Sequence, residues 1–211
     1  MSELHQPAEG LDFLPPHDPI LSQTAESVAP FQISKPEIQE IIDRMFATAY
    51  GEQGDAKRPT MVGLAAPQVG ISQRIIIVGI NSTGLGEQPE LQAFINPKII
   101  GASDETELGR EGCYSTSRVC GIVDRAKSIT YKAYDRTGEI IQGKLEGFPA
   151  RVFQHEVDHL DGIRFPDRVS DDQNLHWVEL DEFGDYRVKW QDWQKRCSRD
   201  RWEAIKAGAA Q

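Results

Sequence analysis

The sequence predicts an α+β fold, with antiparallel strands packed around one central helix and an amphipathic helix near the C-terminus. Three observations predict it: short apolar runs separated by turn residues, a helical segment between Pro149 and Gly162 that follows them, and aromatic residues at helical spacing beyond it. A chain of 211 residues with 39% hydrophobic residues can bury one sizeable core. We therefore expect an arm over residues 1–17, a main domain over 18–170, and a linker with a helical extension over 171–211.

The first regular element that the sequence predicts is a helix from about Ser34 to about Tyr50. Ser34 and Glu37 form a capping-box pattern, in which each side chain satisfies a free backbone N–H of the first turn. Apolar residues then recur at helical spacing: Ile38, Ile41, Ile42, Met45 and Phe46. Residues 51–59 read as a polar loop, and the unbroken apolar run over 75–80 predicts a buried strand.

Three further strands are predicted at 93–100, 128–135 and 139–146. The last two are separated by Arg136, Thr137 and Gly138, a connection typical of a hairpin. The central helix follows, with its proline near the first turn and its glycine just beyond the end, which is the usual asymmetry of helix termini.

The C-terminal segment predicts an amphipathic helix that begins after an acidic stretch over 171–185. Aromatic and apolar residues recur there at helical spacing: Tyr186, Trp190, Trp193 and Cys197. Residues 187–206 carry seven Lys or Arg against three acidic residues, a net charge of +4 in a protein of net −10. We favour an aromatic stripe packed on the protein's own core, with a solvated basic face.

Composition excludes several classes of protein. The formal charge of −10 argues against a dominant nucleic-acid-binding surface, so we expect no DNA partner. No apolar stretch approaches the roughly 20 residues that span a bilayer, and MSELHQPAEG lacks the basic start and apolar run of an export signal. We expect a soluble, cytoplasmic protein. The three cysteines suit a reducing compartment, and we interpret Cys120 and Cys197 as small buried hydrophobic residues.

The strongest chemical signal is HEVDH at 155–159. Two histidines four residues apart on a helix project from the same face and can bind one metal ion together. Glu156 can then reach the open side of that ion without being a ligand. The alternative is a set of chance polar residues on a solvated helix, and the pattern alone supports the two interpretations about equally.

The third ligand separates the classes of metalloenzyme. Phe165 stands where one class of zinc protease has its third histidine, so that class is excluded. Glu179 and Glu182 are the weaker candidates, because they follow an Asp-rich, loop-like stretch. Cys113 is the better candidate, because a thiolate with two imidazoles leaves an open coordination position, as a hydrolytic metal needs.

A third segment, VGLAAPQVG at 62–70, is rich in small residues that let a backbone pass close to a substrate. Gln68 offers an amide donor there. Taken alone, the segment is a Gly/Ala-rich turn without a particular function.

Taken together, GLAAPQ at 63–68, EGCYS at 111–115 and QHEVDH at 154–159 resemble the three ordered motifs of peptide deformylases. The resemblance extends from DPIL at 18–21 to DGIRFPDR at 161–168 and covers most of the chain. It implies a deformylase-like catalytic domain over 18–170 that removes the N-formyl group from the formyl-methionine of new polypeptides. Formate would be released, as part of N-terminal processing after translation.

The resemblance also implies residue roles, carried over motif by motif. The metal ligands on and beside the central helix would be Cys113, His155 and His159. Their ion would be Fe²⁺ in the cell, while Zn²⁺, Ni²⁺ or Co²⁺ can occupy such a site in purified protein. The catalytic group would comprise Glu156 as general base and acid, with Gln68 and the backbone N–H of Tyr114 as oxyanion donors. The substrate-binding group would comprise Val62, Gly63 and Glu111.

Three positions depart from the family pattern, which usually has glycine at Met61, leucine at Tyr114 and often arginine near Cys120. These departures keep two alternatives open: a metallo-hydrolase that acts on another N-formyl or peptide substrate, and a metal-binding or peptide-binding relative without turnover. Family likeness further suggests an ion pair between Arg125 and Asp158. The alternative interpretation is that these residues are two ordinary surface charges. It also suggests that the basic C-terminal helix contacts the ribosome.

Overall fold

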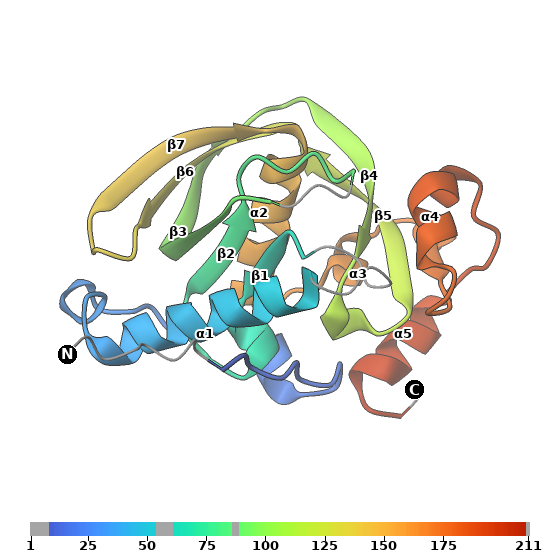
Figure 1. Cartoon of the computed structure of the whole chain (residues 1–211). Helices are drawn as coiled ribbons and strands as arrows, with labels where there is room; N and C mark the ends of the chain where they lie inside the picture. The colour runs from blue at the N-terminus through green and yellow to red at the C-terminus, as the bar shows by residue number, and fades with distance from the viewer. Residues whose placement is uncertain (1–8, 54–60, 86–88, 210–211) are drawn as a thin grey trace.

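Helix α2 (Gly147–Leu160) packs against strands of two antiparallel sheets in the computed structural model (Figure 1). The structure describes residues 9–53, 61–85 and 89–209. Within these residues the larger sheet has the order β1–β2–β3–β6–β7, with β1 (Gly63–Ala65), β2 (Ile75–Gly79), β3 (Leu91–Ala102), β6 (Ser128–Tyr134) and β7 (Ile140–Glu146). The smaller sheet has the order β4–β5–β8, with β4 (Thr106–Gly112), β5 (Val119–Ala126) and β8 (Leu175–Trp177).

Strand β2 separates two hydrophobic clusters, because successive side chains of a strand point to opposite faces. Ile75 and Ile77 join the cluster under helix α1 (Pro36–Gln53), which contains the fully buried Ile42. Ile76 joins the cluster under α2, which contains the fully buried Phe153. The larger sheet is thus covered by α1 on one face and by α2 on the other.

The predicted α1 and the predicted strands of the larger sheet are confirmed within one to three residues at most ends. The β6–β7 hairpin is also confirmed, with Ala133 opposite Ile141. Its turn is closed by Asp135, whose Oδ1 accepts hydrogen bonds from the backbone of Thr137 and Glu139. Helix α1 runs on through Gln53 into the expected loop, whose residues 54–60 lie outside the described residues.

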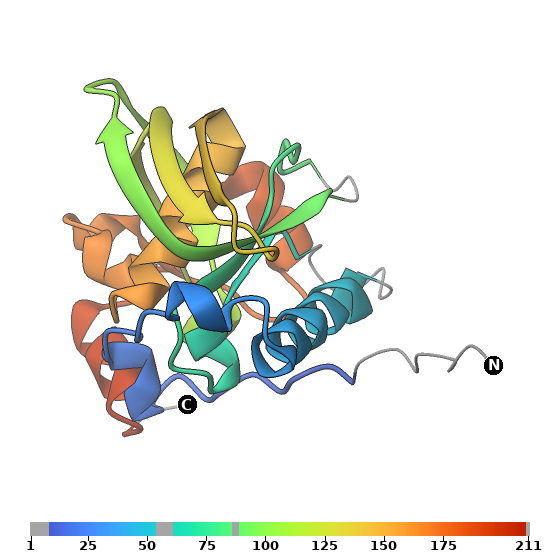
Figure 2. The ribbon, with the colours of Figure 1, turned by 90° about the vertical axis from the view of Figure 1, so that its left-hand side faces the viewer.

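The expected N-terminal arm is described from residue 9 onward, and residues 1–8 lie outside the described residues. Figure 2 shows this segment extended beside α1. The Leu11 amide donates a hydrogen bond to the Thr48 hydroxyl of α1 at 2.6 Å. The arm therefore has a defined place on the main domain.

The strands of the smaller sheet were not predicted from the sequence. Strand β4 carries mostly exposed residues, and both β4 and β5 contain glycine, so neither resembles an apolar strand. Arg110 lies opposite Ile122, and the register continues to Gly112 opposite Cys120. This pairing places Cys113, which directly follows β4, next to α2.

The expectation of one C-terminal helix carrying residues 186–197 is wrong. Helix α4 (Phe183–Lys189) and a short 3₁₀ turn (Trp190–Asp192) end before Trp193, and a separate helix α5 (Arg199–Lys206) follows. Between them the backbone pairs with β8: the Cys197 amide donates to the Leu175 carbonyl at 3.0 Å. Hydrogen bonds with a neighbouring strand replace those that a continuous helix would make.

The C-terminal aromatic residues nevertheless pack on the protein's own core. Tyr186 is 3% exposed and Trp202 is fully buried, while Asp200, Arg201 and Glu203 on the other side of amphipathic α5 are exposed. Among the described residues, no helix is long and apolar enough to cross a bilayer.

Candidate active site

Helix α2 presents the two histidines of the HEVDH motif from one face, with ring centroids 5.0 Å apart. The helix ends at Leu160, and Gly162 follows with φ of +73°, a conformation that favours glycine. A side chain at Gly162 would also meet the backbone of Ser22 and Gln23 at 2.8–2.9 Å. The glycine beyond the helix thus lets the chain leave α2 tightly against the segment that follows the arm.

The three predicted metal ligands lie together. Cys113 follows directly after β4, and its Sγ lies 3.3 Å from Nε2 of His159. One donor atom from each of Cys113, His155 and His159 lies within 4.8 Å of the others. Two ligands of one tetrahedral ion, with bonds of roughly 2.3 Å to sulfur and 2.1 Å to nitrogen, are about 3.5 Å apart. The donor set and its spacing therefore fit a single divalent ion.

The protonation state of His159 also suits a metal ligand. Burial is the largest cause that lowers the pKa of His159 well below its usual value. The imidazole is therefore neutral, which is the form that binds a metal.

Glu111 lies behind His155 and fixes its ring. Its Oε2 lies 2.9 Å from Nδ1 of His155, which leaves Nε2 of His155 to face Cys113 and the metal position. Burial raises the pKa of Glu111, but hydrogen bonds from His155 and Arg125 outweigh it and hold that pKa well below the usual range. The side chain is 4% exposed. This placement favours a positioning role over the side-chain contact with substrate that the resemblance implied.

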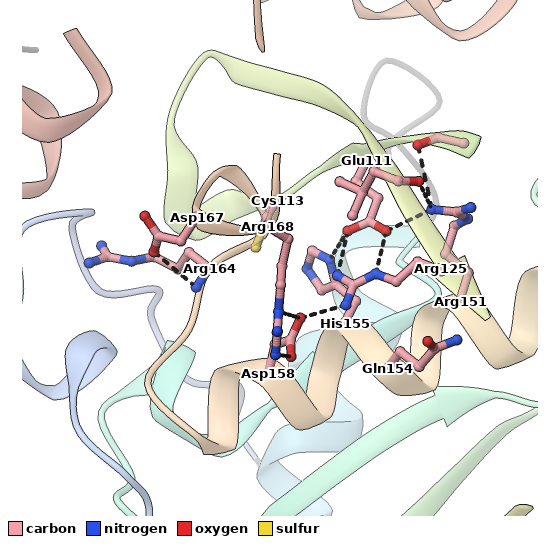
Figure 3. A network of polar contacts seen from close by, with 12 residues as sticks. Glu111, Cys113, Arg125, Arg151, Gln154, His155, Asp158, Arg164, Asp167 and Arg168 are labelled. Carbon is pink, nitrogen blue, oxygen red and sulfur yellow. Dashed lines mark hydrogen bonds and ion pairs between the residues drawn. The ribbon is translucent and has the colours of Figure 1, made fainter. Parts of the chain in front are cut away.

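Three arginines and one further carboxylate, Asp158, lie around this pair (Figure 3). Arg125 donates to both oxygens of Glu111 at 2.9 Å and to Asp158 at 2.5 Å, and all three side chains are less than a tenth exposed. Arg151 donates to Oε1 of Glu111 at 2.9 Å, and Arg168 donates to Asp158 at 2.6 Å. The interpretation of Arg125 and Asp158 as ordinary surface charges is wrong: they form a buried ion pair.

Glu156 is 4% exposed, and its Oε2 has no hydrogen-bond partner among the described residues. Burial raises the pKa of its carboxyl to about 7. Strand β1 passes directly over it, since a side chain at Gly63 would lie 2.3 Å from Oε1. A buried carboxylate with an unpaired oxygen beside a metal ligand set is the arrangement expected of a proton carrier.

Gln68 lies in a 3₁₀ turn (Ala66–Val69) that follows β1. Its Oε1 accepts from the Ala65 amide at 2.8 Å, which turns Nε2 toward the ligands. Nε2 lies 3.2 Å from Cys113 Sγ and 3.3 Å from the Ser115 hydroxyl. An amide donor is thus aimed at the metal position.

Tyr114 begins the 3₁₀ turn (Tyr114–Thr116) after Cys113, and its side chain is 38% exposed. Gly63 is the first residue of β1 and Val62 precedes it, and both are half-buried. The Val62 carbonyl accepts a hydrogen bond from the Gly79 amide. Met61 and Cys120 are buried in separate hydrophobic clusters. Tyr114 is therefore the most exposed of the three departures from the family pattern.

The alternative third ligands lie elsewhere. Glu179 pairs with Arg118 at 2.6 Å, and Glu182 pairs with Lys195. Arg151 was not identified from the sequence, although it precedes His155 by one helical turn and so shares its face. That spacing is the signal that could have identified it.

A sequence model described as polypeptide deformylase matches residues 11–175. The chain belongs to the peptide deformylase family. Peptide deformylase from Thermotoga neapolitana is 40% identical over 158 residues, which are 75% of this chain and 86% of the relative. Peptide deformylase 1 from Bordetella pertussis is 39% identical over 77% of this chain and 89% of its own length.

Solved structures of the family have the same fold. The class I type b peptide deformylase from Acinetobacter baumannii, bound to Met-Ala-Ser, has a TM-score of 0.69 and 34% identity over 77% of this chain and 99% of that one. The peptide deformylase from Thermotoga maritima has a TM-score of 0.66 and 37% identity over the same shares. The match to the family model ends at Leu175, so α4 and α5 lie beyond it.

Proposed function

We propose that this chain is a metal-dependent amide hydrolase that removes the N-formyl group from the formyl-methionine of newly made polypeptides. The observation that carries the proposal is the buried, unpaired carboxylate oxygen of Glu156 beside the ligand set of Cys113, His155 and His159. Each part of this constellation lies within the residues that the family model matches. The Acinetobacter baumannii relative binds Met-Ala-Ser, a tripeptide that begins with methionine.

An extended peptide fits beside β1. This strand lies at one end of the sheet order within the described residues, with Val62 and Gly63 partly exposed, and the edge of a sheet can pair with the backbone of a peptide. Because Gly63 has no side chain, the space beside the Glu156 carboxyl stays open, and the formyl group of the substrate can reach that carboxyl. We assign Val62 and Gly63 to the edge that borders the substrate, and Tyr114 to the opposite side.

The chemistry follows from the positions of the side chains. A divalent ion held by the three ligands would supply Lewis acidity, which lowers the pKa of water and polarises the formyl oxygen. Glu156 takes the proton of the attacking water and delivers it to the departing amine, so one carboxylate serves both steps. The Gln68 amide and the Tyr114 backbone N–H stabilise the negative charge that develops on the formyl oxygen.

We propose Fe²⁺ as the metal in the cell, with Zn²⁺, Ni²⁺ or Co²⁺ as substitutes in purified protein. A thiolate and two imidazoles suit all four ions, and zinc binds such donors more tightly than iron, so metal supply decides the occupant. Activity of the iron form should fall in air, as the metal or Cys113 is oxidised. Air-stable activity with stoichiometric iron would contradict this assignment.

We place the enzyme in the cytoplasm, where formylated new chains arise and thiols stay reduced. Ribosome contact through residues 187–206 has less support. Arg199 is held by Asp172, Lys206 by Asp167, and Arg201 lies 3.3 Å over the Trp177 ring. Packing within the protein therefore accounts for these cations. Salt-sensitive co-sedimentation with ribosomes would revive the docking proposal, and its absence would end it.

Substrate selectivity tests the proposed function. The metal-loaded protein should release formate from formyl-Met-Ala-Ser and leave acetyl-Met-Ala-Ser and the free tripeptide intact. Cleavage of the peptide bonds instead would favour a peptidase of the same fold.

A further inference from the structure

Two consecutive residues of the N-terminal arm each contact one of the two proposed oxyanion donors. The Phe13 ring stacks on the Tyr114 ring, with centroids 4.6 Å apart and planes 16° from parallel. The Leu14 amide donates a hydrogen bond to the Gln68 carbonyl at 2.9 Å.

The two donors come from different parts of the fold. Gln68 follows β1 of the larger sheet, whereas Tyr114 follows β4 of the smaller sheet. Their separation therefore depends on how the two sheets meet, and stabilisation of an oxyanion requires both donors at fixed positions. The arm crosses this junction and contacts both sides of it.

The arm is itself held on either side of these contacts. Upstream, Leu11 is bonded to Thr48 of α1. Downstream, the guanidinium of Arg164 donates to the Pro16 carbonyl and, at 2.8 Å, to the Ser22 hydroxyl. Arg164 is 1% exposed and lies 5.1 Å from the centre of the Trp202 ring of α5. Helix α5 thus packs on the arginine that holds the C-terminal end of the arm.

We propose that the N-terminal arm is a positioning element, in which Phe13 and Leu14 hold Tyr114 and Gln68 at the spacing that the oxyanion requires. The proposal rests on the proposed function for its kinetic consequence. Loosening the arm should slow turnover without weakening metal binding or substrate binding, because the ligands and the β1 edge are untouched. The loss should be about tenfold, below the 100-fold or more expected when a donor is removed outright.

The test compares Phe13→Ala and Phe13→Trp, which retains a stacking ring, with Phe31→Ala. Phe31 is a matched control because it is 75% exposed in a 3₁₀ turn (Pro30–Gln32) away from the ligands. We expect Phe13→Ala to lower kcat about tenfold at unchanged KM and metal content, and the other two variants to stay near the parent. Amides of residues 114–116 should exchange hydrogen faster in Phe13→Ala alone.

Parent-like kcat and exchange in Phe13→Ala would overturn the proposal, as would an effect confined to KM, which would make Phe13 a substrate contact. Should Phe13→Ala fail to fold, Phe13→Leu keeps the apolar contact without the stack and serves in its place. If the parent itself released no formate, the proposed function would fail. The exchange measurement would then still decide whether the arm orders Tyr114.

Discussion

The Nδ1 atom of His155 lies 2.9 Å from Oε2 of Glu111, a carboxylate that Arg125 and Arg151 hold in place. A proposed metal ligand is therefore oriented by a side chain that is itself fixed by two buried cations. This chain of contacts joins strands β4 and β5 to helix α2. It makes the geometry of the metal site depend on residues that never touch the metal.

Replacing Glu111 with glutamine should weaken metal binding about 10- to 100-fold, because the His155 ring loses its charged partner. The dissociation constant, measured by competition with a chromogenic chelator, checks this. Glu105→Gln is the control, since Glu105 pairs with Lys127 on the surface. Equal metal affinity of Glu111→Gln and the parent would show that Glu111 does not orient the ligand.

Replacing Arg125 with methionine should lower the free energy of unfolding by about 3–5 kcal/mol, because two buried carboxylates lose their counter-charge. Arg136→Met is the matched control: the Arg136–Asp43 pair is exposed, and its loss should cost at most about 1 kcal/mol. Urea unfolding at fixed metal saturation measures both. Similar losses for the two variants would argue against a buried network.

Gln68→Ala should lower kcat about 100- to 1000-fold at nearly unchanged KM, because an oxyanion donor acts on the transition state and not on the bound substrate. Gln142→Ala, at an exposed position of β7, should behave like the parent. Steady-state kinetics with a formylated peptide separates the two constants. A raised KM at constant kcat would assign Gln68 to substrate binding.

His176 should make stability depend on pH. Burial, then the charge of Arg196, lowers the pKa of His176 from 6.5 to about 4 in the folded protein. Its Nδ1 lies 3.0 Å from the Tyr186 hydroxyl, and it pairs with Cys120 across β5 and β8. Because the folded pKa is the lower one, this stabilisation is present above about pH 6.5 and is lost as the pH falls toward 4.

The parent should therefore lose about 2 kcal/mol of stability between pH 7 and pH 5 that His176→Gln does not lose. Urea unfolding of both proteins at the two pH values gives the comparison. An identical pH dependence in the variant would mean that His176 is not protonated on unfolding in this range.

Periodic segments explain what the sequence could predict of the fold. Helix α1, strand β2 and the β6–β7 hairpin are defined by local apolar spacing and turn residues, so they were predictable. Strands β4 and β5 hold glycine and charged residues, and only their pairing makes them strands. The spacing of Trp193 and Cys197 fits a helix, yet hydrogen bonds with β8 decide their conformation.

The same distinction applies to the site. The group of Cys113, His155 and His159 could be predicted as a candidate ligand set, because the two histidines are four residues apart and Cys113 lies in a motif of its own. The hydrogen bonds of Glu111 could not be predicted, because its partners Arg125 and Arg151 lie on β5 and α2, far from it in the sequence. The contacts of Phe13 with Tyr114 also join segments far apart in the sequence.

The most direct test of the account is formate release from formyl-Met-Ala-Ser by anaerobically prepared, iron-loaded protein, beside the Glu156→Ala variant at equal metal occupancy. All three proposed ligands remain in the variant, so it removes only the proposed proton carrier. We predict rapid release by the parent and near-total loss in the variant. No release by a fully metal-loaded parent, or parent-like release by Glu156→Ala, would contradict the central claim.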